Sequence, residues 1–150
     1  MDGMIITELG LGVLVSGLCA TIQSATLLAL FYLLLRFFDR IESRFSVIVN
    51  NTILLVVVWV LAIMHLVQVA VWAAVFRYLG CFDSYYQALY FSLMTYSTVG
   101  YGDLVAPDVW KLFCGVESIM GMLMFGWSAS FLFGTVSQFY KIRLLRHERM

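Results

Sequence analysis

Charged residues separate four long stretches of the chain that are almost free of charge. The stretches are residues 9–35, 45–76, 84–102 and 112–140, and the last contains a single charged residue, Glu117. A helix that crosses the ~30 Å hydrocarbon core of a membrane needs ~20 mostly apolar residues, so the first, second and fourth stretches are each long enough. The pattern predicts three membrane-spanning helices, over residues 8–36, 46–76 and 107–140.

The third stretch, residues 84–102, is ambiguous because it is rich in Ser, Thr, Tyr and Gly. Without its last five residues it would form only about 20 Å of helix at 1.5 Å per residue, which reaches part way into the membrane. It therefore predicts a re-entrant helix over residues 84–97 rather than a fourth span. The run Ser84-Tyr85-Tyr86-Gln87 has the form of a capping box, which places the start of this helix at Ser84.

Basic residues gather after the first and after the last predicted span, in residues 36–44 and 141–149. With three spans both clusters lie on one side of the membrane, which the positive-inside rule makes the cytoplasmic side; a fourth span would place the second cluster outside. This arrangement predicts a multi-pass protein of the cell membrane, plasma or inner, that is surrounded by lipids. Its N-terminus is expected outside and its C-terminus in the cytoplasm.

The composition supports a membrane protein and excludes two other classes. Hydrophobic residues make up 63% of the chain and charged residues 12%, against roughly a quarter charged in soluble domains. The formal net charge is zero, whereas a protein that binds nucleic acid needs a basic face. An enzyme is not expected, because only His65 and His147 are histidines and no nucleophile–base pair accompanies them. The cysteines, at positions 19, 81 and 114, form neither a disulfide framework nor a metal-ligand spacing.

The third stretch ends in a run that fits neither a helix nor a strand: Thr98-Val99-Gly100-Tyr101-Gly102-Asp103. Irregular backbone inside a membrane is tolerated only where it lines a cavity or is buried in protein. Five extended residues span about 12–16 Å, enough for several ion sites in a row. The two glycines permit torsions that turn successive carbonyl groups inward, and Thr98 can add its hydroxyl group at the inner end. The run therefore predicts an ion filter built from carbonyl oxygens, in which Tyr101 would point away from the ions and brace the filter against the re-entrant helix.

Residues 84–140 resemble the pore module of the two-helix potassium channels, in which a pore helix, a filter and an inner helix follow an outer helix. Residues 98–103 match the filter signature of that family without a substitution, and residues 88–97 resemble its pore helix. The resemblance implies passive, potassium-selective conduction with no cofactor besides the permeant ion. The K+ ions would be coordinated by five residues: Thr98, Val99, Gly100, Tyr101 and Gly102. The resemblance also implies a homotetramer, because each chain supplies one strand of the filter.

The expected fold is an all-α membrane protein with three transmembrane helices, a re-entrant pore helix and a filter loop, assembled as a four-fold tetramer. The expected units are an N-terminal helix with a cytoplasmic elbow (1–45), the pore module (46–140) and a basic cytoplasmic tail (141–150). Within the module the expected parts are the outer helix 46–76, pore helix 84–97, filter 98–103 and inner helix 107–140. Since the tail is short, any soluble gating module would be a separate regulatory chain.

The first predicted helix lies outside the two-helix pattern and carries small residues at intervals of four: Gly12, Ser16, Ala20 and Ser24. Small residues on one face let a neighbouring backbone approach closely, so this face is expected to dock on the pore module. Gln23 lies near mid-span and needs a polar partner. His65 and Gln68 share a face of the second helix, where hydrogen bonds between helices, with Gln23 as one partner, are favoured over a pH-sensing role for His65.

The resemblance identifies residues around the filter. Asp103 matches the aspartate that follows the filter in the family and braces its outer mouth. Met94 stands where some relatives have a glutamate that pairs with this aspartate, and Phe91 stands where some have a tryptophan that bonds the filter tyrosine. The brace at Asp103 is therefore not expected from Met94, and Tyr90 or Tyr96 is expected to substitute for the tryptophan that bonds the filter tyrosine.

Glu117 is expected at the depth of the filter, about 14 Å along the last helix from Asp108. A carboxylate in a membrane helix costs ~2.5–3.5 kcal/mol on insertion scales, so it should have a partner. We hypothesise that it supports the filter from behind by bonding Ser92, Thr95 or Tyr96. A wet outer vestibule is the alternative environment.

The inner helix contains candidates for a hinge and a gate. By family analogy a hinge is expected near Gly121, and close packing between helices explains this glycine equally well. Phe125 and Phe131, with Met124 and Phe133, are candidates for lining the cavity or the gate, although aromatic residues at such spacing are more often packing residues.

A non-conducting or regulatory subunit that co-assembles with another channel is the alternative function. Such a subunit would share the fold. It would not need the glycines of the filter, and their presence argues for conduction.

Overall fold

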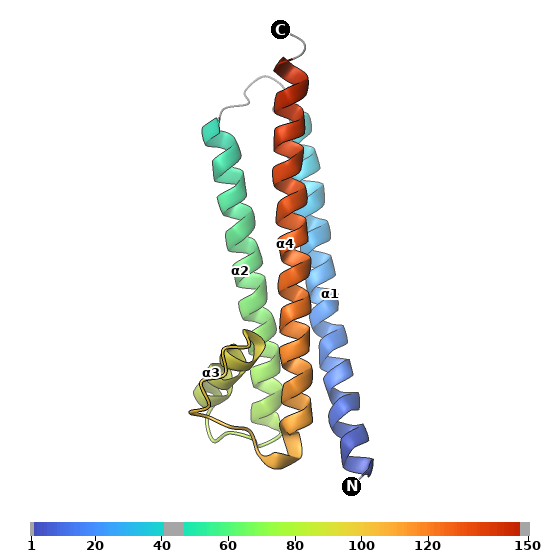
Figure 1. Ribbon diagram of the computed structural model, residues 1–150, viewed down its shortest axis with the longest axis vertical. Helices are drawn as coiled ribbons and strands as arrows, with labels where there is room; N and C mark the ends of the chain where they lie inside the picture. The colour runs from blue at the N-terminus through green and yellow to red at the C-terminus, as the bar shows by residue number, and fades with distance from the viewer. Residues whose placement is uncertain (1, 41–46, 148–150) are drawn as a thin grey trace.

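The computed structural model describes residues 2–40 and 47–147. The elements in chain order are α1 (Asp2–Arg40), α2 (Val47–Tyr78), α3 (Tyr85–Tyr96), the short 3-10 helix η1 (Asp108–Trp110) and α4 (Lys111–His147) (Figure 1). Three segments are long and apolar enough to cross a membrane: Gly3–Phe37, Val49–Tyr78 and Asp108–Lys141. The predicted all-helical membrane fold, with three spans and one shorter helix, is confirmed.

The long helices extend past the ends that the charges predicted. α1 starts at Asp2 rather than at residue 8 and continues to Arg40, and α4 continues to His147 rather than ending at residue 140. Lysine, arginine and glutamate are good helix formers, so a charged residue can mark the edge of an apolar span without ending the helix. Most of the predicted tail is therefore helical. Residues 41–46, which include most of the predicted elbow, and 148–150 lie outside the described residues.

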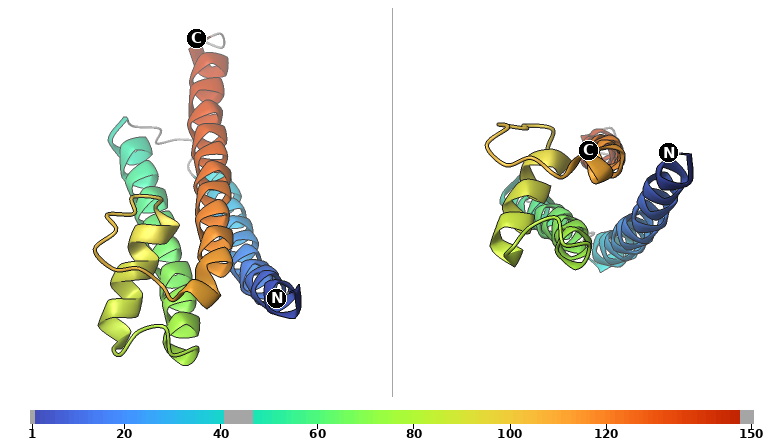
Figure 2. Two further views of the ribbon diagram at one scale, coloured as in Figure 1. Left: turned by 60° about the horizontal axis from the view of Figure 1, so that its bottom comes forward. Right: turned by 90° about the horizontal axis from the view of Figure 1, so that it is seen from below.

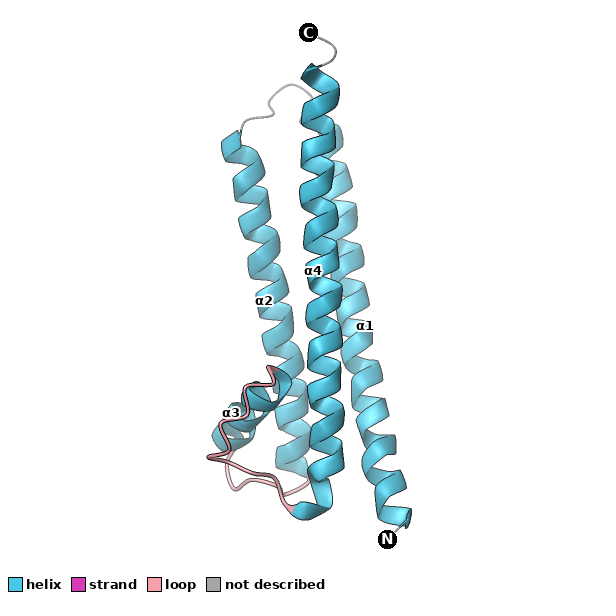
Figure 3. Ribbon diagram, in the orientation of Figure 1, coloured by secondary structure: helices cyan, strands magenta, loops and turns pink. Residues whose placement is uncertain are grey.

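The helices form a bundle in which α1 and α4 run in the same direction and α2 runs opposite to both (Figure 1). The N-terminus lies at the end of the bundle that carries α3, and the C-terminus lies at the other end. Seen along the bundle, α3 and α1 lie on opposite sides of α2 and α4 (Figure 2). Within the described chain the non-helical connections are residues 79–84 and 97–107, on either side of α3 (Figure 3).

α2 ends in a Schellman motif, which turns the chain back toward α3. The Gly80 N–H donates to the Arg77 carbonyl at 3.2 Å, and the Cys81 N–H donates to the Phe76 carbonyl at 3.0 Å. Gly80 has φ +71°, the left-handed conformation that this motif requires at its turning residue. The glycine thus sets where the second span stops.

α3 begins with the predicted capping box. The Gln87 N–H donates to Ser84 Oγ at 3.2 Å, and the Ser84 N–H donates to Gln87 Oε1 at 3.3 Å. The middle of α3 is anchored by Phe91, whose ring packs on Phe76 of α2 and Phe82 of the connecting loop, at centroid distances of 5.1 and 4.8 Å. Phe91 therefore acts as a core residue that positions the helix.

α1 packs on α4 through part of the predicted small-residue face. A Cβ on Gly12 would lie 3.0 Å from Val116, and Ser16 is buried. Ser24 is exposed, so the prediction is wrong at this position. Steps of four residues turn about 40° beyond one full turn of a helix, so such a row drifts away from the interface, and Gln23 is buried instead.

Glu8, which the sequence marked only as the edge of a span, caps the start of α4. It is buried, and its Oε2 accepts a hydrogen bond from the Leu112 N–H at 3.1 Å. The first N–H groups of a helix lack intrahelical partners and carry partial positive charge, so a carboxylate stabilises this end by ~0.3–1 kcal/mol. α1 is thereby attached to α4 near the loop that precedes it.

Candidate functional site

The loop that follows α3 is tied to the end of that helix by main-chain hydrogen bonds. The Thr98 N–H donates to the Thr95 carbonyl at 3.0 Å, and the Gly100 N–H donates to the Met94 carbonyl at 3.2 Å. The first bond is typical of a helix end whose turning residue is left-handed, a place that glycine usually occupies. The position of residues 98–100 is therefore set by the last turn of α3.

The sign of φ alternates along the predicted filter. It is positive at Thr98 (+61°), Gly100 (+51°) and Gly102 (+79°), and not at Val99 or Tyr101. Successive carbonyl groups of an ordinary strand point to opposite sides, and reversing every second residue turns them toward the same side. A β-branched residue at positive φ, as at Thr98, is a costly conformation of the kind that clusters at functional sites.

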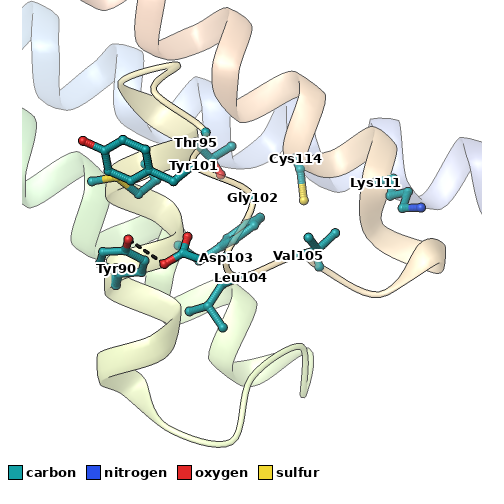
Figure 4. Close-up of a pocket in the computed structure, with 13 residues that line it drawn as sticks. Tyr90, Thr95, Tyr101, Gly102, Asp103, Leu104, Val105, Lys111 and Cys114 are labelled. Carbon is teal, nitrogen blue, oxygen red and sulfur yellow. Dashed lines mark hydrogen bonds between the residues drawn. The ribbon is translucent and has the colours of Figure 1, made fainter.

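The side chains of this run are open in a single chain. Val99 is 49% and Tyr101 is 73% exposed. Tyr101 borders a cavity of about 160 Å³ between the loop, α3 and the start of α4 (Figure 4). The expectation that Tyr101 braces the filter against the pore helix is therefore not met within one chain, because its own α3 leaves most of the ring uncovered.

Asp103 is held by α3 through Tyr90. The Tyr90 hydroxyl group donates to Asp103 Oδ2 at 2.8 Å (Figure 4). The hydrogen bond to this carboxylate raises the pKa of Tyr90, so the phenol keeps the proton that it donates. The contact that Met94 cannot provide for Asp103 is thus made by Tyr90, one helical turn earlier.

Tyr96 does not substitute for a filter brace in the way that was predicted. Its side chain is 1% exposed and is directed toward α2, where its hydroxyl group donates to Gln68 Oε1 and lies 3.2 Å from His65 Nδ1. The Tyr90 hydroxyl group is also engaged elsewhere, with Asp103. The described chain therefore has no hydrogen bond from either tyrosine to Tyr101.

Glu117 is fully buried where α4 meets α3 and α2. Its Oε1 accepts a hydrogen bond from the Ser92 hydroxyl group, which also lies 3.0 Å from the Val69 carbonyl oxygen. The predicted contact with the pore helix is present at Ser92 rather than at Thr95 or Tyr96. The alternative environment, a wet vestibule, is wrong because the side chain is 0% exposed.

The last turn of α3 rests directly on α4. A Cβ on Gly121 would lie 2.0 Å from the Tyr96 carbonyl oxygen, so a larger residue does not fit without movement of the backbone. One turn earlier on α4, the Ser118 hydroxyl group donates to the Thr95 carbonyl at 3.1 Å. Close packing accounts for Gly121, and the hinge at this position stays a prediction.

The candidates for a cavity or gate differ in what they contact. Met124 is buried in the core of the single chain, which excludes it from a pore-facing surface. Phe125 is 42% exposed and packs on the His65 ring at a centroid distance of 4.6 Å. Phe131 is half-buried against the cluster between α1 and α2, and Phe133 is exposed. A gating role for Phe125, Phe131 or Phe133 stays a prediction.

Sequence reasoning missed three polar contacts, made by Glu8, Ser118 and Ser128. Ser128 lies 2.9 Å from Gln23 Nε2 and 3.0 Å from His65 Nε2. Ser128 could have been predicted from its depth in the membrane, since each polar side chain inside a span needs a partner at the same depth on another span. The hydroxyl groups of Ser84 and Ser92 were counted as hydrogen-bonding groups, but those of serines in the long helices were not.

Comparison with known proteins supplies one match. A family model described as Ion channel matches residues 52–138, which is more than half of the chain and runs from the start of α2 through α3 and most of α4. No curated protein and no solved structure matches the chain. The match leaves out α1, in agreement with a pore module preceded by an additional helix.

Proposed function

The chain belongs to the ion-channel family of two-helix pore modules, with an additional N-terminal helix, and we propose that it is a potassium-selective channel. Four copies would surround one pore in the cell membrane, and K+ would pass through it passively. The ion would be coordinated by backbone oxygens of five residues: Thr98, Val99, Gly100, Tyr101 and Gly102.

The observation that carries this proposal is the alternation of φ along residues 98–102, in a run that matches the filter signature. A K+ ion is selected where rings of carbonyl oxygens replace the water that it sheds. A backbone whose successive carbonyl groups turn to one side can supply one oxygen at each level. The hydrogen bonds to the last turn of α3 hold that backbone in place.

The tetramer follows from the number of oxygens. One chain supplies one carbonyl group per level, and replacing a hydration shell takes a ring of them, as from four such loops. The exposed Val99 and Tyr101 support this assembly, since a neighbouring copy would cover them. We propose that α3 lies toward the outside of the membrane. This orientation agrees with the positions of Arg36 on α1 and Lys141 on α4, which both lie toward the end of the bundle away from α3.

The test is ion flux through the purified protein in liposomes, with K+ and Na+ compared. We expect K+ flux that exceeds Na+ flux by about 100-fold or more and that Ba2+ blocks, because carbonyl rings discriminate by field strength and ion size. Tyr101→Ala is the control and should lose this preference. Equal K+ and Na+ flux from the wild type would reject potassium selectivity.

The alternative is a non-conducting subunit that assembles with a different channel. It would give no flux at any pH or voltage, although the protein is folded and tetrameric by size. The presence of both glycines at positive φ, Gly100 and Gly102, argues against it. Flux that appears only with another channel chain in the same liposome would favour it.

Replacing Glu117 by leucine is expected to reduce sustained K+ flux by about ten-fold, because the lost hydrogen bond between α4 and Ser92 is worth ~1–3 kcal/mol. The K+ to Na+ ratio should stay as in the wild type, since Ser92 lies more than a turn before the filter. Recordings from single channels in planar bilayers measure both quantities.

Two further variants control this prediction. Glu117→Gln keeps an oxygen that can accept from Ser92 and should restore most of the flux. Ser130→Ala changes an exposed hydroxyl group of the same helix, bonded only to its own backbone at Gly126, and should have no effect. Sustained flux in the leucine variant equal to that of the wild type would exclude the support role of Glu117.

A further inference from the structure

Five polar side chains form a closed ring of hydrogen bonds inside the bundle. Together they come from all four α-helices, α1 to α4. The members are Gln23 of α1, His65 and Gln68 of α2, Tyr96 of α3 and Ser128 of α4. All are buried except His65, which is half-buried. Neither the proposed filter nor the Glu117 contact uses this ring.

The ring can be followed bond by bond. Gln23 Nε2 donates to Ser128 Oγ at 2.9 Å, and Gln68 Nε2 donates to Gln23 Oε1 at 3.0 Å. The Tyr96 hydroxyl group donates to Gln68 Oε1. His65 closes the ring, because its Nδ1 lies 3.2 Å from the Tyr96 oxygen and its Nε2 lies 3.0 Å from Ser128 Oγ.

Counting donors and acceptors gives the ring a single direction. The one proton of the Tyr96 hydroxyl group goes to Gln68, so the Tyr96 oxygen accepts and His65 Nδ1 must carry the proton. His65 Nε2 then accepts from the Ser128 hydroxyl group, whose oxygen accepts from Gln23. Each member therefore donates once and accepts once around the ring, with His65 neutral, and bonds in such a chain polarise and strengthen one another.

The second amide proton of each glutamine also has an acceptor nearby. Gln23 Nε2 lies 3.3 Å from the Met124 carbonyl oxygen, and Gln68 Nε2 lies 3.4 Å from the Cys19 carbonyl oxygen. Both glutamines are 0% exposed, so removing one member of the ring leaves a buried polar atom of each neighbouring member without its ring partner. Loss of any one member therefore opens the ring and affects the two members bonded to it.

Tyr96 is the member of the ring that lies closest in the chain to the proposed filter. It is the last residue of α3, two residues before Thr98, and its backbone carbonyl rests on Gly121. We propose that Gln23, on a helix outside the family match, is a positioning residue for the filter: through Gln68 it holds Tyr96, and Tyr96 holds the turn from which residues 98–102 start. This proposal rests on the proposed function of those residues as the filter.

The first experiment does not depend on ion flux. Hydrogen exchange of the purified protein is measured by mass spectrometry for wild type, Gln23→Leu, Tyr96→Phe and Ser24→Ala. In Gln23→Leu the amides of residues 94–102, which include the Thr98 and Gly100 donors, should exchange about ten-fold faster, because local opening of this segment becomes easier. Ser24→Ala alters the exposed neighbour on α1 and should exchange as the wild type does.

The second experiment asks whether the filter itself changes. Single-channel recordings should show a K+ to Na+ ratio lowered by about ten-fold in Gln23→Leu, a readout that fewer folded channels would not alter. Tyr96→Phe removes one oxygen from the ring and should lower the ratio similarly. Because either change opens the same ring, the double variant should be no worse than the single ones.

The outcomes separate this proposal from the proposed function. If the amides of residues 94–102 exchange in Gln23→Leu and Tyr96→Phe as they do in the wild type, the positioning role is overturned. This holds whether or not the wild type conducts K+. If exchange rises equally in every helix, the role is purely one of folding and the proposal is likewise overturned. If the wild type fails to conduct K+ while exchange rises only at residues 94–102, the ring positions this loop and the channel function is rejected. Should Gln23→Leu not fold, Tyr96→Phe decides alone.

Discussion

Gly121→Ala is expected to abolish sustained K+ flux and to lower the K+ to Na+ ratio of any flux that remains. The new Cβ would lie 2.0 Å from the Tyr96 carbonyl oxygen and 2.9 Å from its carbon, so α3 or α4 must move by about 1 Å. Overpacking of this kind costs ~1–3 kcal/mol, and the atoms that must yield are backbone rather than a flexible side chain. They are also the last backbone atoms before Ser97 and the proposed filter.

Flux per reconstituted protein and the midpoint of thermal unfolding measure this effect. Gly115→Ala and Gly126→Ala are matched controls on the same helix, since a Cβ at either position meets nothing within 4 Å in the chain. A hinge at Gly121 makes a different prediction, in which the open probability changes and selectivity does not. If Gly121→Ala has the flux and selectivity of the wild type, the close contact between Gly121 and the Tyr96 carbonyl group is contradicted. A change in open probability alone would support a hinge at Gly121.

Gly100→Asp is expected to eliminate K+ flux while the protein still folds as a tetramer. Gly100 has φ +51°, which costs a residue with a side chain ~1–2 kcal/mol. Four carboxylates would also enter the ring of carbonyl oxygens, where they would bind cations too tightly to release them. The strain is a modest part of the effect, and the chemistry of the pore is the larger part.

Gly80→Asp separates these two causes, because Gly80 has a similar φ of +71° and open space but lies in the loop before α3. It should lower stability by ~1–2 kcal/mol and leave the K+ to Na+ ratio unchanged. Liposome flux and thermal unfolding of both variants give the comparison. Potassium-selective flux through Gly100→Asp would show that residues 98–102 are not the ion path.

The first helix illustrates how much of the structure can be predicted from the sequence. That it is an apolar span was predicted, although not its ends, and so was the need of Gln23 for a partner, because an amide group in lipid must be bonded. The partners were predicted only in part, since the bond to Gln68 was anticipated and the bonds to Ser128 and the Met124 carbonyl were not. A span that is apolar on every side carries little information about which way it is rotated.

The short helix α3 shows the same division within one element. Its start at Ser84 was predictable because the capping box is a local signal between residues three apart. The directions of Tyr90 and Tyr96 were not, because they depend on how α3 is rotated against α2 and α4. Both tyrosines were candidates for bonding Tyr101, and the structure directs one to Asp103 and the other to Gln68.

By itself the sequence determined the three spans and the shorter helix, since apolar length and capping residues act over neighbouring residues, and it marked the Gly-rich run that we propose as the filter. Only the tertiary structure decided that Glu117 meets Ser92, that Gly121 supports the Tyr96 carbonyl and that α1 joins a ring of hydrogen bonds. These contacts join residues that are 25 or more positions apart along the chain. They depend on the rotation and offset of each helix, which packing and polar pairing set together and hydropathy leaves open.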